Sequence, residues 1–124
     1  METTTKIVSR YWATAEARDW AAFGALLAQD VVCELPQTRE RVEGRAGVVR
    51  FNAEYPGDWH LSLVRVIGED RNACTWITVT LAGEELTGLS FFEFTDDGLI
   101  RRITDFWPES YEPPAGREHL VQRY

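Results

Sequence analysis

The sequence predicts an α+β domain in which three N-terminal helices pack on a curved, mostly antiparallel sheet that forms a cone with an internal pocket. Three observations lead to this prediction: helical spacing of apolar residues in the first third, strand-like segments from Trp59 to Trp107, and turn signals between those segments. A chain of 124 residues is long enough for one core, so we expect a single domain over residues 1–124.

Each predicted helix has a start signal and an apolar face. Thr3 to Thr5 cap the first helix, and Asp19 caps the second, while Gly44 precedes the third, which stops at Pro56-Gly57. The apolar positions expected to face the core are Ile7, Val8, Tyr11, Trp12 and Ala15 in the first helix, Trp20, Phe23, Leu26 and Leu27 in the second, and Val48, Val49, Phe51 and Tyr55 in the third.

Five strands are predicted, a short one at 31–36 and four near 59–68, 73–82, 86–95 and 99–107. The last four are joined by short turns, which favours an antiparallel meander. Residues 109–124 are predicted to be an extended tail that ends in a helical turn. The charged segment 39–45 is interpreted as a solvated loop with weak ion pairs, or as a rim that attracts an anionic substrate.

Composition excludes several classes of function. Twenty acidic and 13 basic residues give a net charge of −7, which argues against nucleic acid as a partner, and no apolar run is long enough to cross a membrane. His60 and His119 are too far apart to suggest a metal site, and no glycine-rich nucleotide loop is present, so we expect neither a metal nor an organic cofactor. Cys33 and Cys74 are interpreted as reduced residues of a cytoplasmic protein.

Three segments, 7–36, 43–55 and 89–107, resemble the nuclear transport factor 2-like superfamily, and in particular its SnoaL-like members, which are related to ketosteroid isomerases and polyketide cyclases. The resemblance implies a cystatin-like cone with a pocket. In the isomerases it implies a tyrosine where Tyr11 stands and two acids where this chain has Leu35 and Ser90, so we do not expect ketosteroid isomerase activity. In the epoxide hydrolase relatives it implies an Arg–Asp pair where Gly88 and Ser90 stand.

One acid implied by the resemblance is present in this chain: Asp105, on the last predicted strand. The epoxide hydrolase relatives have an acid at this place, and SnoaL-like cyclases use an aspartate near the chain's end as general acid or base. Asp105 shares a strand face with Ile103 and Trp107, so it should be partly desolvated and able to transfer protons. The alternative is a solvated carboxylate or one paired with an arginine. Tyr11 is interpreted either as a donor to a substrate oxygen or as a core tyrosine.

The remaining candidates would contact the substrate. Leu35, Phe92 and Trp107 would shape the pocket and Ser90 would offer a polar contact, while His60 would act as a partner base or lie on the surface. We therefore predict an enzyme that performs acid/base chemistry on a small apolar molecule: an isomerase, cyclase, dehydratase or hydrolase. The alternatives are a non-catalytic ligand-binding module and a dimerisation module whose cavity is filled by tryptophans. Aromatic residues on the outer sheet face would favour a homodimer.

Overall fold

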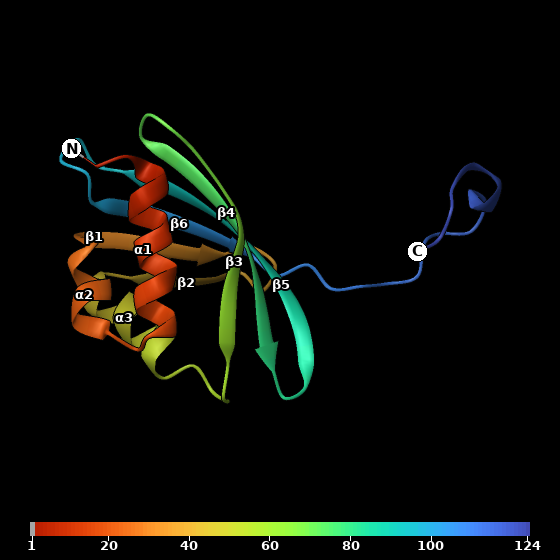
Figure 1. Ribbon diagram of the computed structural model, residues 1–124, viewed down its shortest axis with the longest axis horizontal. Helices are drawn as coiled ribbons and strands as arrows, with labels where there is room; N and C mark the ends of the chain where they lie inside the picture. The colour runs from red at the N-terminus through yellow and green to blue at the C-terminus, as the bar shows by residue number, and fades with distance from the viewer. Residues whose placement is uncertain (1) are drawn as a thin grey trace.

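The computed structural model describes residues 2–124, in which three α-helices cover one face of a six-stranded sheet (Figure 1). The predicted α+β class is confirmed. The helices are α1 (Thr4–Glu16), α2 (Trp20–Ala25) and α3 (Arg45–Ala53). The strands are β1 (Leu27–Leu35), β2 (Glu40–Glu43), β3 (His60–Glu69), β4 (Asn72–Leu81), β5 (Glu84–Phe94) and β6 (Ile100–Phe106), and a short 3₁₀ helix, η1 (Glu118–Leu120), lies near the C-terminus.

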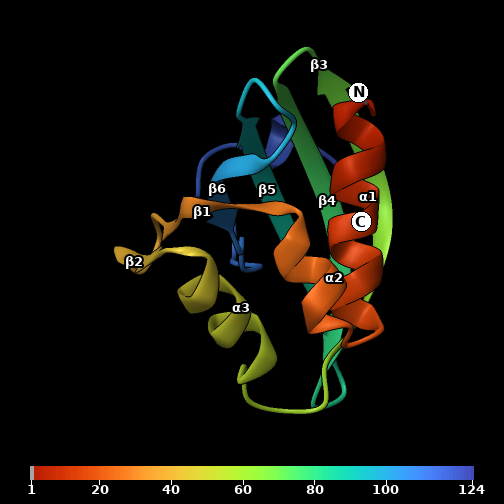
Figure 2. The ribbon, with the colours of Figure 1, turned by 90° about the vertical axis from the view of Figure 1, so that its left-hand side faces the viewer.

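Helix α1 buries the face that its apolar spacing predicts, namely Ile7, Val8, Tyr11, Trp12 and Ala15. The indole N–H of Trp12 donates a hydrogen bond to Thr75 Oγ1 at 2.9 Å, which ties α1 to β4. Figure 2 shows α1 lying along β3 and β4, with α3 beside β1 and β2. The helices therefore fill the concave side of the sheet.

The second helix is capped as predicted but is shorter than predicted. The carboxylate of Asp19 accepts a hydrogen bond from the backbone N–H of Ala22 at 3.2 Å, which satisfies one free donor of the first turn. The helix ends at Ala25, and Leu27 begins β1 instead of continuing the helix. The prediction that Leu27 is helical and that the strand starts at residue 31 is wrong, because Leu27 and Val31 are both fully buried as strand residues.

The sheet has the order β2-β1-β6-β5-β4-β3. Strands β3 to β6 form the predicted antiparallel meander. β1 adds to β6 in parallel, with Cys33 opposite Ile103, and the N–H of Ile100 donates to the carbonyl of Leu26 at 2.9 Å. This parallel pairing joins the first strand of the chain to the last.

Residues 40–43, within the segment interpreted as a solvated loop, form the edge strand β2. Val42 is half-buried opposite Cys33 and packs against the core, while Arg41 pairs with Glu34 of β1 at 2.6 Å. The loop prediction is wrong for residues 40–43. Val42, the one apolar residue of this charged segment, packs against the core and so determines which face of the short strand is buried.

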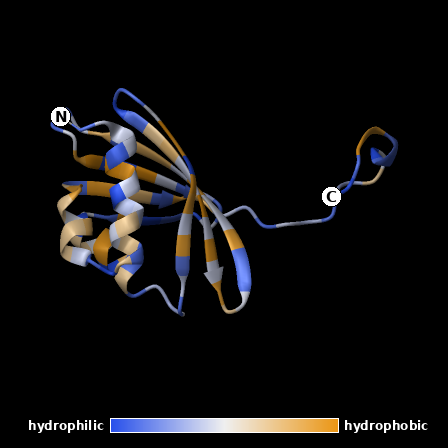
Figure 3. Cartoon of the chain, viewed as in Figure 1, coloured by the Kyte–Doolittle hydropathy of each residue, from blue (hydrophilic) through white to orange (hydrophobic). Residues whose placement is uncertain are grey.

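Apolar and polar residues alternate along the strands (Figure 3), and the inward set forms the core. The ring of Tyr11 packs between Phe23, at 4.5 Å between centroids, and Phe92, at 5.2 Å. After β6 the chain leaves this body as the extended tail that the sequence predicts, with η1 near its end (Figure 1).

Candidate functional site

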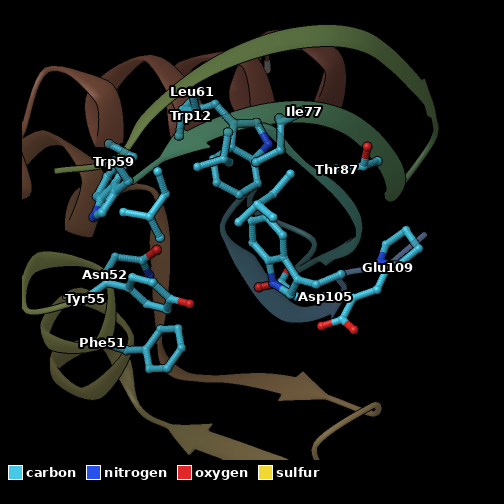
Figure 4. Close-up of a pocket in the computed structure, with 16 residues that line it drawn as sticks. Trp12, Phe51, Asn52, Tyr55, Trp59, Leu61, Ile77, Thr87, Asp105 and Glu109 are labelled. Carbon is cyan, nitrogen blue, oxygen red and sulfur yellow. The ribbon is translucent and has the colours of Figure 1, made fainter. Parts of the chain in front are cut away.

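A cavity of about 230 Å³ lies between α1, α3 and the concave side of the sheet (Figure 4). Its wall is mostly apolar: Trp12 from α1 and Phe51 from α3 face aliphatic side chains of β3, β4 and β5. Tyr55, Pro108 and Glu109 border the cavity and are exposed, so it opens to solvent between the end of α3 and the start of the tail.

Asp105 borders this cavity from β6 and is 9% exposed. The β5–β6 register sets Ser90 directly opposite it, and the Ser90 hydroxyl donates to Oδ1 at 2.6 Å. The thiol of Cys33, on the other neighbouring strand, donates to Oδ2 at 3.5 Å. Each carboxylate oxygen therefore has one protein donor, and both donors come from the strands that flank β6.

Burial dominates the electrostatics of this carboxyl group. Loss of solvent raises the pKa of Asp105, and the hydrogen bonds from Ser90 and Cys33, which favour the charged form, oppose that shift. Burial and then the nearby Asp105 carboxylate also raise the pKa of the Cys33 thiol, so the thiol stays protonated and acts as a donor. The sequence-based expectation of a desolvated acid agrees with this geometry, and no arginine pairs with Asp105 in the described part of the chain.

Tyr11 lies behind the cavity and is not among the residues that border it. It is 1% exposed, and burial raises its pKa well above the usual value, with the charges of Asp105 and Cys33 adding to the shift and a hydrogen bond with the Asn52 side chain opposing it. Its hydroxyl is therefore neutral. Asn52 itself does border the cavity, and its amide donates to the carbonyl of Val48 at 2.9 Å.

The other predicted site residues do not all border the cavity. Trp107 borders the cavity beside Asp105. Ser90, Leu35 and Phe92 are buried but do not border the cavity. Ser90 contacts Asp105, and Phe92 packs on Tyr11.

His60 does not border the cavity. Its ring pairs with Glu16 at 2.8 Å and with Asp58 at 3.1 Å on the surface, and these contacts raise its pKa, the hydrogen bond with Glu16 most strongly. His60 therefore lies on the surface, which is one of the two positions that the sequence left open, and it does not contact Asp105.

Sequence reasoning missed several residues of the wall. Trp12, Phe51 and Tyr55 are predicted to face the core, and neither Asn52 nor Trp59 is predicted as a site residue, yet all five border the cavity. A signal that could have found this part of the wall is the polar residue in the apolar face of the third helix, where Asn52 stands beside Phe51 and Tyr55.

Gly88 leaves room for the ring of Trp107. A Cβ atom at residue 88 would lie 2.9 Å from the Trp107 ring and 3.0 Å from Ile77, so only glycine leaves room for the indole to lie against β5.

The arginines of the 39–45 segment, offered as a rim for an anionic substrate, do not border the cavity: Arg41 pairs with Glu34, and Arg45 donates to the carbonyl of Leu27.

Within residues 2–124, no three His, Cys, Asp or Glu side chains are grouped in a way that could hold a metal ion. None of the helices described here has the length and apolarity required to cross a membrane.

The three helices and the curved six-stranded sheet define the nuclear transport factor 2-like fold. Residues 8–103 match the model of the SnoaL-like domain, so the chain belongs to this family. None of the curated proteins matches the sequence.

Solved structures agree with this assignment. A Kribbella flavida protein described as a proposed ketosteroid isomerase is 51% identical, with a TM-score of 0.94 over 98% of this chain and 89% of its own. An NTF-2 like protein of unknown function from Burkholderia xenovorans is 24% identical, with a TM-score of 0.82 over 98% and 94%. A Pseudomonas putida protein described as a proposed polyketide cyclase is 25% identical, with a TM-score of 0.72 over 87% and 93%.

Proposed function

We propose that this chain is an enzyme that moves a proton on a small, largely apolar molecule, with Asp105 as the proton carrier. The observation that carries the proposal is the position of Asp105: it is the one carboxyl group in the described chain that is both buried and at the wall of the cavity. The other bordering carboxyl, Glu109, is exposed.

The surroundings of Asp105 suit this role. A raised pKa brings a carboxyl group closer to the operating pH, where it can both accept and give up a proton. Ser90 and Cys33 fix its orientation, and each oxygen keeps a second acceptor position that can face a ligand. Asn52 is positioned to contact a polar group of the same ligand.

The size and composition of the cavity limit the substrate. Its volume of about 230 Å³ is below the ~300–1,000 Å³ of drug-sized ligand sites, so a molecule of one or two rings would fill it. Leu35 carries no proton at the position where the resemblance to isomerases implies a base, so the chemistry rests on one acid. Isomerisation, cyclisation, dehydration and hydrolysis are all compatible with one acid.

Two model substrates of this size test the proposal: cyclohex-3-en-1-one, whose isomerisation produces an absorbing conjugated ketone, and cyclohexene oxide, whose hydrolysis gives a diol. We expect turnover of at least one, and a ~10²–10⁴-fold lower kcat/KM in Asp105→Asn, the usual size of a lost acid–base group. Asp30→Asn, which removes an exposed carboxyl outside the cavity, is the matched control. Full activity in Asp105→Asn would refute the proposed role of this residue.

One observation favours ligand binding without chemistry as a second candidate function. No second buried titratable group borders the cavity in the described residues, so Asp105 has no partner to carry a proton in the opposite direction. A protein that binds either model substrate, measured by quenching of its tryptophan fluorescence, but turns over neither would support this alternative.

We also propose that the chain forms a homodimer through the outer face of the sheet. Ile67, Trp76 and Phe91 point away from the helices and are each about half exposed, and Phe91 stacks edge-to-face on Phe106 at 6.0 Å. Neighbouring apolar side chains of this size on one face are typical of an interface.

The expected result is a dimer in sedimentation velocity that Phe91→Glu converts to monomers, because a charge would be buried without a partner. Leu120→Glu places the same charge on the tail and should leave the dimer intact. A wild-type protein that is monomeric at 100 µM would contradict the homodimer.

A further inference from the structure

The charged residues that border the cavity in the described chain both carry negative charge. Asp105 and Glu109 border it, and no lysine, arginine or histidine does so within the described residues. The wall therefore offers no group that could neutralise an anionic ligand, and an anion would lie close to a buried carboxylate. The field inside the cavity favours positive charge.

The neutral part of the wall also suits a cation. Five aromatic side chains border the cavity: Trp12, Phe51, Tyr55, Trp59 and Trp107. The face of an aromatic ring carries negative charge density, and indole attracts cations most strongly. The N–H of Trp12 is already bound to Thr75, so the positive edge of that ring is satisfied within the protein.

One of these rings already holds a cation. The guanidinium carbon of Arg18 lies 3.5 Å from the centroid of the Trp59 ring, and Arg18 also donates to the backbone carbonyl of Trp59. Arg18 does not itself border the cavity. The chain thus uses an indole of this wall as a cation acceptor.

Asp105 completes the arrangement because its own partners carry no charge. The hydroxyl of Ser90 and the thiol of Cys33 orient it without neutralising it. A buried carboxylate without a counter-ion is costly, and a ligand that brings the opposite charge removes that cost.

We propose that the cavity selects small organic cations, such as a protonated amine or a quaternary ammonium group on a one- or two-ring molecule, over neutral molecules of the same shape. The inference rests on the proposed function and narrows it, because it gives the largely apolar substrate one cationic centre. A bound cation also holds Asp105 ionised, which is the form that accepts a proton.

A pair of probes that differ in charge alone tests the proposal: 3-hydroxy-N,N,N-trimethylanilinium and its neutral isostere 3-tert-butylphenol. Their affinities are measured by isothermal titration calorimetry at pH 6.5, where both phenol groups stay protonated. We expect the cation to bind at least ~10-fold more tightly to the wild-type protein, in line with the attraction of desolvated cations to aromatic faces and to a carboxylate. Asp105→Asn should remove most of this preference and leave the affinity for the phenol within ~3-fold.

Two further variants locate the effect. Trp107→Leu should lower the affinity for the cation more than that for the phenol. Glu109→Gln should change the cation's affinity by less than ~3-fold, and 0.5 M NaCl should remove that change, because this carboxyl is exposed and screened. If Glu109→Gln abolishes the preference as fully as Asp105→Asn does, the selectivity belongs to the rim and the inference is wrong.

The outcomes separate this inference from the proposed function. Equal or tighter binding of 3-tert-butylphenol to the wild-type protein would overturn the cation preference and leave a functional ligand cavity in place. Failure of both probes to bind at millimolar concentration would overturn the cation preference and remove the support for the proposed function as well.

Discussion

Replacing Asp105 with Asn is expected to make the protein more stable at pH 8 while it lowers turnover. The carboxylate is buried in an apolar wall with two neutral donors, so its charge disfavours the folded state. An amide of the same shape carries no charge and can still bond Ser90. The melting temperature should therefore rise by a few degrees at pH 8.

The pH dependence of this gain has a defined sign. Burial raises the pKa of Asp105 in the folded protein above its ordinary value of 3.8, so between these two values the folded state binds more protons than the unfolded state. The free energy of unfolding of the wild-type protein must then fall as the pH rises through that window. The advantage of Asp105→Asn should be absent below pH 3.8, grow through the window and stay constant above it.

Melting curves of both proteins at several pH values measure this difference, with Asp30→Asn as the exposed control. A wild-type protein that is more stable than Asp105→Asn at pH 8 would mean that the carboxylate is a net stabilising group, and that its burial is not a cost retained for function.

Phe92→Ala is expected to lower the free energy of unfolding by about 3–5 kcal/mol, the usual cost of removing a buried phenyl ring. Phe92 is 1% exposed and packs edge-to-face on both Tyr11 and Trp12, so its loss would leave a hole between α1 and the sheet. Because Trp12 borders the cavity, the same change should also loosen the site wall.

The neighbouring residue provides a matched control. Phe91 is the same residue type on the same strand, but it faces outward and is half exposed. Phe91→Ala should therefore cost less than ~1 kcal/mol in urea unfolding at protein concentrations at which the proposed dimer is dissociated. A cost at Phe92 no larger than that at Phe91 would contradict the assignment of Phe92 to the core.

Local patterns were sufficient to predict the elements that depend on neighbouring residues. The helical spacing from Ile7 to Ala15, the cap at Asp19 and the turns of the meander are all encoded within a few residues of one another. The parallel β1–β6 pairing depends on residues far apart in the chain. The edge strand β2 pairs with β1 as a local hairpin, and its charged sequence is what made it resemble a loop. No local pattern encodes a parallel contact between Cys33 and Ile103.

The same holds for the candidate site, where features that depend on one strand could be predicted and contacts between distant strands could not. Strand alternation was sufficient to place Asp105 on the inner face beside Trp107, because period-2 alternation depends on β6 alone. The donors that hold Asp105 could not be predicted as a set, since Cys33 reaches it only through the parallel pairing. His60 shows the converse: its place at the start of β3 was predicted, but its surface pairing with Glu16 depends on where α1 ends.

The parallel pairing of β1 with β6 has a consequence for biosynthesis. The nascent chain cannot complete its sheet until the ribosome has released residues 100–106, although the β3–β4 hairpin can form earlier from local contacts. Until then one edge of β1 has no partner. Translation that stalls before Ile100 would thus leave an aggregation-prone edge for chaperones to shield.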